Sequence, residues 1–78
     1  MRLTFFGRLR EAVGADALDR SPPANIVDAE SLRGWIGAEF PDLLDPKVRI
    51  ALDDVIVGDA ALIAGVAEAG FLPPVSGG

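Results

Sequence analysis

The last six residues of the sequence carry its clearest indication of chemistry. They read Pro73, Pro74, Val75, Ser76, Gly77 and Gly78. The two prolines favour an extended polyproline II stem, and the two glycines have no side chains and few backbone restrictions. Six residues at about 3.1 to 3.3 Å each can reach roughly 20 Å, enough to thread a narrow channel in another protein. We therefore expect a thin, flexible C-terminal tail whose reactive group is the carboxylate of Gly78.

That carboxylate needs activation before it can transfer its acyl group. One of its oxygens must become a leaving group, most simply as an adenylate made with ATP, after which a sulfur or amine nucleophile can take the acyl group. The chain has no phosphate-binding loop, so a separate enzyme would have to use the ATP. Because the chain has no cysteine, any sulfur that it carried would have to sit on the C-terminal carbonyl, as a thiocarboxylate.

The composition excludes several other classes of function. There is no cysteine and no histidine, which removes disulfides, thiolate nucleophiles, imidazole bases and the usual zinc ligands. Seven basic and twelve acidic residues give a net charge of -5, which repels nucleic acid, and no basic strip suits a membrane surface. No apolar run approaches a membrane span, and the first residues lack a signal-peptide pattern. We expect a cytoplasmic protein with no metal site, no nucleic-acid partner and no membrane contact.

The first part of the chain predicts a hairpin-like unit. Residues 2–6 are rich in β-formers, and alternation places Phe5 and Phe6 on opposite faces of this strand, so one of them is free for an interface. Residues 8–13 read as a short helix that ends at Gly14, because glycine can take the positive φ of a C-cap. Residues 16–20 would then return antiparallel to the first strand.

A longer helix follows the proline-containing loop. Asp28 is the expected N-cap and Pro41 the expected end, and the apolar residues between them recur at helical spacing, which predicts core positions for Leu32, Trp35, Ile36 and Phe40. After it, Asp53-Asp54 reads as a solvated turn between two strands, at residues 48–52 and 55–57.

The end of the domain has a weaker pattern. In residues 60–70 we interpret Leu62 and Ile63 as core contacts with no further role, and residues 68–72 predict the last strand. One main helix packed across a mixed sheet is an α+β fold with the plan of a ubiquitin-like β-grasp. Residues 1–72 would form this domain and residues 73–78 the tail.

Two segments match a known family. Residues 71–78 read FLPPVSGG and residues 3–11 read LTFFGRLRE. With these segments the chain resembles the small subunits of molybdopterin synthase, the MoaD-like sulfur carriers of the ubiquitin-like β-grasp family. The resemblance spans nearly the whole chain, and the terminal octet is its most specific part. It departs from the family before the last strand, where residues 64–70 keep only Glu68 of a polar Gly-Asp-Glu-like turn.

The resemblance implies a reaction cycle. An adenylating enzyme of the ubiquitin-activating type would use ATP to convert Gly78 to an acyl adenylate, and sulfur from a sulfur donor enzyme would replace AMP. The loaded tail would enter the large synthase subunit and give its sulfur to cyclic pyranopterin monophosphate. The chain would hold no cofactor and would be a non-catalytic subunit and co-substrate, in a heterotetramer of two small and two large subunits.

The resemblance also implies a docking surface for both partners, formed by Phe6, Arg10, Phe71 and Leu72. Three alternatives stay open. The chain could carry sulfur for another pathway such as thiamine, or act as a ubiquitin-like modifier joined to lysines through Gly78. It could also be a plain binding module with an idle tail.

Overall fold

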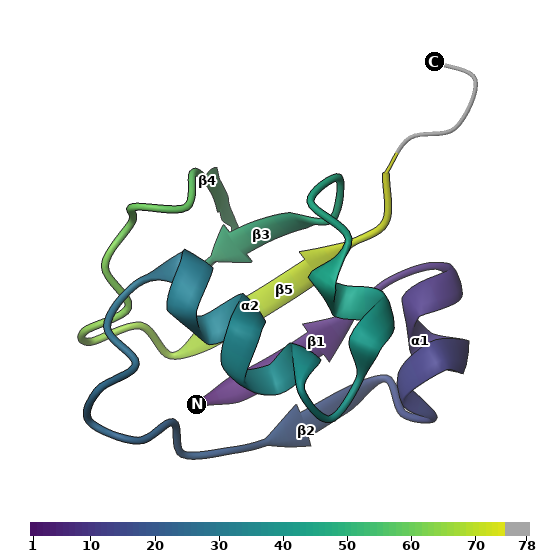
Figure 1. Ribbon diagram of the computed structural model, residues 1–78, viewed down its shortest axis with the longest axis horizontal. Coiled ribbons are helices and arrows are strands. Elements are labelled where there is room, and N and C mark those ends of the chain that lie inside the picture. Colours follow the sequence, from purple (N-terminus) through teal and green to yellow (C-terminus); the bar gives the residue numbers. More distant parts are fainter. Residues whose placement is uncertain (75–78) are drawn as a thin grey trace.

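The computed structural model describes residues 1–74, which form one five-stranded mixed sheet with helices on one side (Figure 1). The strands are β1 (Arg2–Phe5), β2 (Ala17–Asp19), β3 (Arg49–Leu52), β4 (Val55–Val57) and β5 (Glu68–Leu72). The helices are α1 (Arg8–Val13), α2 (Ala29–Gly37) and the 3-10 helix η1 (Pro41–Leu44). The strand order is β2-β1-β5-β3-β4, with β1 and β5 parallel and the other pairs antiparallel. The predicted β-grasp fold is confirmed.

The N-terminal unit forms as the sequence predicts. Helix α1 covers the expected residues, and Gly14 caps it in the left-handed conformation at φ 85°, where its N–H donates to the Arg10 carbonyl oxygen (2.8 Å). Strand β2 then pairs antiparallel with β1. Strand β1 ends one residue earlier than predicted, at Phe5, so Phe6 lies in the turn to α1.

Helix α2 begins where the sequence predicts and ends earlier. The Asp28 carboxylate accepts the Ser31 N–H (2.9 Å) while the Ser31 hydroxyl accepts the Asp28 N–H (3.1 Å), which makes a capping box. The helix was expected to continue to Pro41 but ends at Gly37. A Cβ at Gly37 would clash with the Leu44 side chain, so the absence of a side chain there lets η1 fold back against α2.

The second half of the sheet is built on a tight hairpin. Asp53 and Asp54 both have positive φ, 47° and 70°, as the central residues of a type I′ turn require, and they connect β3 to β4. Strand β5 has the predicted bounds and lies between β1 and β3, where it is paired on both sides.

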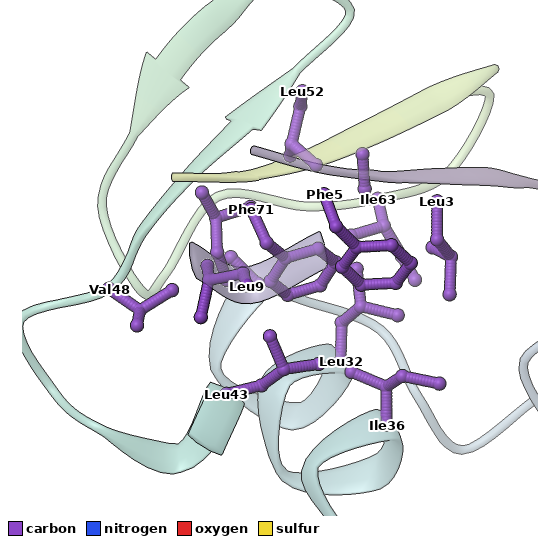
Figure 2. Close-up of a cluster of buried hydrophobic side chains, with 13 residues drawn as sticks. Leu3, Phe5, Leu9, Leu32, Ile36, Leu43, Val48, Leu52, Ile63 and Phe71 are labelled. Carbon is purple, nitrogen blue, oxygen red and sulfur yellow. The ribbon is translucent and has the colours of Figure 1, made fainter. Parts of the chain in front are cut away.

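The core lies between the sheet and α2 (Figure 2). Its centre is the pair Phe5 and Phe71, whose rings stack with centroids 5.6 Å apart. Ile63 contacts this core as predicted, but Leu62 does not, because its side chain is 70% exposed. Trp35 and Phe40, expected in the core, pack against it while partly exposed. None of the helices in residues 1–74 has the length and apolar content to cross a membrane.

Candidate functional site: the open sheet face and the tail stem

One face of the sheet has no helix across it among residues 1–74. Side chains alternate along each strand, so the strands that send Leu3, Ile50 and Phe71 into the core place other residues on the opposite face. These opposite positions include Thr4, Ala51, Ile56, Gly70 and Leu72. Figure 1 shows α2 crossing the other face. The open face is therefore the surface that this fold can offer to a partner.

A shallow hollow of about 230 Å³ lies on this face, and we call it the sheet-face hollow. Its lining residues are Thr4, Phe6, Ala51, Asp54, Ile56, Glu68, Gly70 and Leu72. Gly70 makes its floor, because a Cβ there would lie only 3.2 Å from the Phe6 ring and 3.3 Å from Thr4 Oγ1. Phe6 is 48% exposed and Ile56 57% exposed, so two large apolar side chains flank a glycine floor. Such a surface suits a protein interface.

The four residues expected on the docking surface do not all lie there. Phe6 and Leu72 line the sheet-face hollow together, and Arg10 is exposed on neighbouring α1 without lining it. Phe71 requires a correction, because its side chain is fully buried against Phe5 in the core. In a central strand the alternation that exposes Leu72 must bury its neighbour. Phe71 can support the surface from below but cannot contact a partner.

The stem of the tail leaves the sheet beside this hollow. The Phe6 N–H donates to the Phe71 carbonyl oxygen (3.1 Å), which extends the β1–β5 pairing to the end of β5. Gly7 follows at φ 56° and ψ -136°, and a Cβ there would lie 2.9 Å from Pro73 Cγ. Gly7 thus lets the turn after β1 pack closely on Pro73. Both Pro73 and Pro74 are half-buried.

The remaining tail residues carry the predicted chemistry. Val75, Ser76, Gly77 and the reactive Gly78 lie outside the described residues, so their assigned roles stay predictions. Within residues 1–74, no group of three or more acidic side chains is placed to hold a metal ion. What the described part supplies is a partly apolar hollow on the open sheet face and the stem that begins at Pro73.

Sequence reasoning missed the role of Asp53, which was read as a solvated turn residue. Its carboxylate accepts the N–H groups of Ala67 (3.1 Å) and Glu68 (2.9 Å), and its own N–H donates to the Glu68 carbonyl oxygen (2.9 Å). These bonds tie the β3–β4 turn to the start of β5, in the segment where the family's polar turn is absent. Two consecutive aspartates in a two-residue hairpin predict the turn, but not this long-range contact.

The shortest ion pair among residues 1–74 lies in a different part of the fold from the stem. Arg20 binds Glu39 through two bonds, Nη1 to Oε1 at 2.6 Å and Nη2 to Oε2 at 3.1 Å. The hydrogen bond from Arg20 holds the pKa of Glu39 below its usual range, and the same bond raises the pKa of Arg20. This pair joins the end of β2 to the turn after α2, so its role is structural.

A mixed five-stranded sheet with one helix packed across it has the ubiquitin-like β-grasp fold. A family model described as the ThiS family matches residues 3–78, and the chain belongs to that family. The ThiS/MoaD-type proteins are small, non-catalytic sulfur carriers with a ubiquitin-like fold, so the resemblance drawn from the sequence is confirmed at this level.

Solved structures agree with the fold. A Pyrococcus furiosus protein described as molybdopterin converting factor, subunit 1, superposes with a TM-score of 0.74 at 20% identity, over 95% of each chain. The solution structure of the Haloferax volcanii HVO 2177 protein superposes with a TM-score of 0.77 at 21% identity, over 99% of this chain and 84% of that one. A search of curated proteins found no match.

Proposed function

We propose that this chain is the small subunit of molybdopterin synthase, a sulfur carrier that works through a thiocarboxylate at Gly78. The observation that carries the proposal is the terminal octet FLPPVSGG, whose first two residues complete β5 and whose prolines form the stem. The name of the Pyrococcus furiosus neighbour, a molybdopterin converting factor subunit, supports the same pathway.

The proposed chemistry takes place at the terminal carboxylate, because the chain has no cysteine to carry sulfur. The Gly78 carboxylate attacks the α-phosphate of ATP in an adenylating enzyme of the ubiquitin-activating type, and pyrophosphate leaves. Sulfide delivered by a sulfur donor enzyme then displaces AMP and leaves a thiocarboxylate. In the large synthase subunit this sulfur passes to cyclic pyranopterin monophosphate, and water restores the carboxylate. Two turnovers supply the two sulfurs of a dithiolene, and the chain itself binds no cofactor.

The described residues contribute docking in this cycle. Phe6 and Leu72 in the sheet-face hollow, with Arg10 beside it, would contact both the adenylating enzyme and the large subunit. Since the stem starts at the edge of this hollow, a partner bound there is next to the tail. Two partners that need the same surface bind in turn, which fits a carrier that is loaded and then unloaded in the cytoplasm.

Deletion of Gly78 tests the proposal. Molybdopterin formation would be measured with the large subunit, the adenylating enzyme, ATP and a sulfur source, using the full chain and the shortened chain. We expect the shortened chain to form no thiocarboxylate by mass spectrometry and no molybdopterin. Addition of one residue after Gly78 should have the same effect, because the activated carbonyl would no longer be terminal. Full activity of either variant would refute the proposal.

A sulfur carrier for thiamine synthesis is the second candidate, because the matching family model is that of the ThiS family. The loaded protein would be offered separately to the large synthase subunit and to a thiazole-forming enzyme, and the thiocarboxylate remaining would be measured by mass spectrometry. Consumption by the thiazole-forming enzyme alone would favour this candidate. An isopeptide adduct through Gly78 in the native cell would instead indicate a protein modifier.

A further inference from the structure

A second hollow lies beside the stem and shares no lining residue with the sheet-face hollow. It has a volume of about 580 Å³, and we call it the basic cleft. Its lining residues are Arg33, Pro46, Lys47, Val48, Arg49, Ile50, Val57, Gly58, Asp59, Pro73 and Pro74. Because Pro73 and Pro74 are among these residues, the cleft lies beside the stem, and Figure 1 shows the loop before β3 next to the same segment.

The charge of the cleft is opposite to that of the whole chain. Its lining contains three cations, Arg33, Lys47 and Arg49, and one carboxylate, Asp59, whereas the net charge of the chain is -5. Arg33 is fixed in place, because Nη1 donates to the Asp45 carbonyl oxygen (2.8 Å) and Nη2 lies 3.6 Å from Asp59 Oδ1. Because Asp59 is paired with Arg33, the positive charges of Lys47 and Arg49 are not balanced by a carboxylate among the lining residues.

Those two cations belong, with Arg8 and Arg10, to the basic residues that form no ion pair within residues 1–74. Lys47 and Arg49 are exposed. Arg2 and Arg20, by contrast, pair with Glu68 and Glu39, outside the cleft. Arg49 lies opposite Leu72 in the β3–β5 pairing, which places it beside the stem and on the open face of the sheet, at the border of the cleft.

The cleft is poorly suited to a compact anion such as phosphate. Phosphate sites use converging backbone N–H groups, but Pro46, Pro73 and Pro74 have none to donate. The Lys47 and Val48 N–H groups are already bonded to Asp45, at 2.9 Å each. The cations of the cleft are separate side chains, next to apolar proline rings. This pattern fits carboxylate side chains spaced along another protein.

We propose that the basic cleft binds acidic side chains at the rim of the channel through which a partner takes up the tail. The inference rests on the proposed function, because it requires a partner that receives residues 73–78. Such a partner would enclose the stem, and Pro73 and Pro74 are also lining residues of the cleft, so the rim of its channel would lie next to the cleft. An acidic rim would otherwise be repelled by a chain of net charge -5, and local positive charge at the stem also orients the encounter.

Binding of the full chain to the large synthase subunit, measured by calorimetry and stopped-flow at low and high salt, tests this. The variants are Lys47→Gln, Arg49→Gln and the double change, with Arg20→Gln as a control that removes one equal charge outside the cleft. We expect each cleft variant to weaken binding about two- to fivefold at low salt, mainly through the association rate. The double variant should also bind with a smaller salt dependence, and the control should bind as the unmodified chain does.

The outcomes separate the two proposals. If the unmodified chain binds the large subunit and the double variant binds equally well with the same salt dependence, the cleft proposal is refuted. If the unmodified chain is never loaded at Gly78, the proposed function fails instead. A measurement without any partner then decides the cleft: an acetylated hexaglutamate peptide, titrated into the ¹⁵N-labelled chain, should shift the amide signals of Lys47 and Arg49. Equal shifts in the double variant, or shifts with inorganic phosphate alone, would overturn the proposal.

Discussion

Substitution of Gly7 by alanine would test whether the turn after β1 directs the tail. Gly7 has φ 56° and ψ -136°, and a residue with a side chain in this sparsely populated region loses roughly 1 to 3 kcal/mol of stability. In addition, the new Cβ would lie 2.9 Å from Pro73 Cγ, closer than real Cβ contacts, so the turn and the stem must shift relative to one another. We expect Gly7→Ala both to lower stability and to change the direction in which the tail leaves.

Gly14→Ala is the matched control. Gly14 also has positive φ, 85°, but a Cβ there would meet nothing within 4 Å. Its replacement should cost about 1 kcal/mol and leave the stem in place. Urea unfolding would give the stability of both variants, and thiocarboxylate formation with the adenylating enzyme would give tail presentation, under conditions where both proteins are folded.

The expected result is a loss of loading in Gly7→Ala that Gly14→Ala does not share. A second change, Pro73→Ala, removes the Cγ that the new methyl group would contact, so the double variant Gly7→Ala with Pro73→Ala should recover part of the loading. Equal loading by the two glycine variants would refute the argument that Gly7 positions the stem. So would a loading defect that Pro73→Ala leaves unchanged.

Three other changes test the remaining features of the site. Gly70→Val should fill the sheet-face hollow, lower stability by about 1 to 3 kcal/mol and abolish partner binding in calorimetry; binding at full strength would contradict a docking role for the hollow. Asp53→Ala should lower the free energy of unfolding in urea by on the order of 1 kcal/mol, because the Ala67 and Glu68 N–H groups lose their acceptor; an unchanged midpoint would contradict this. The Ser31 hydroxyl and N–H hold the pKa of Asp28 below its ordinary value of about 3.9. The ionised Asp28 carboxylate therefore stabilises the fold fully above pH of about 3.9. This contribution to the free energy of unfolding is lost as the pH falls through the lower pKa that Asp28 has in the folded protein. Asp28→Asn should therefore make unfolding less acid-dependent, and identical pH profiles would refute that assignment.

Structural features that depend on a few neighbouring residues were predicted correctly from the sequence. Gly14 ends α1, Asp28 caps α2 and Asp53-Asp54 forms the hairpin turn, because each depends on the local backbone and one nearby partner. The bounds of β5 also follow from local composition, although the segment before it is weakly patterned. These elements were sufficient to predict a β-grasp.

The errors concern contacts between distant parts of the chain. Helix α2 ends at Gly37, where η1 packs back against it. Of the neighbours Leu62 and Ile63, Ile63 is buried and Leu62 is exposed, because the Ile63 side chain is the one that faces the core. Likewise, Phe71 and Leu72 cannot both be exposed in a paired central strand, but the sequence does not say which one faces α2. The Asp53 contact with β5 spans 14 or 15 residues and has no periodic signal.

The pairing of β5 also determines how far the tail can reach. A slip of one residue would move the stem by about 3.3 Å and exchange the faces of Phe71 and Leu72, which would place a phenylalanine in the sheet-face hollow and empty part of the core. Pairing with β1 on one side and β3 on the other, together with the Asp53 contacts, prevents this slip. Under the proposed function, the partner's channel has to bring the Gly78 carbonyl to one point, so we expect a shift in the register of β5 to impair sulfur transfer.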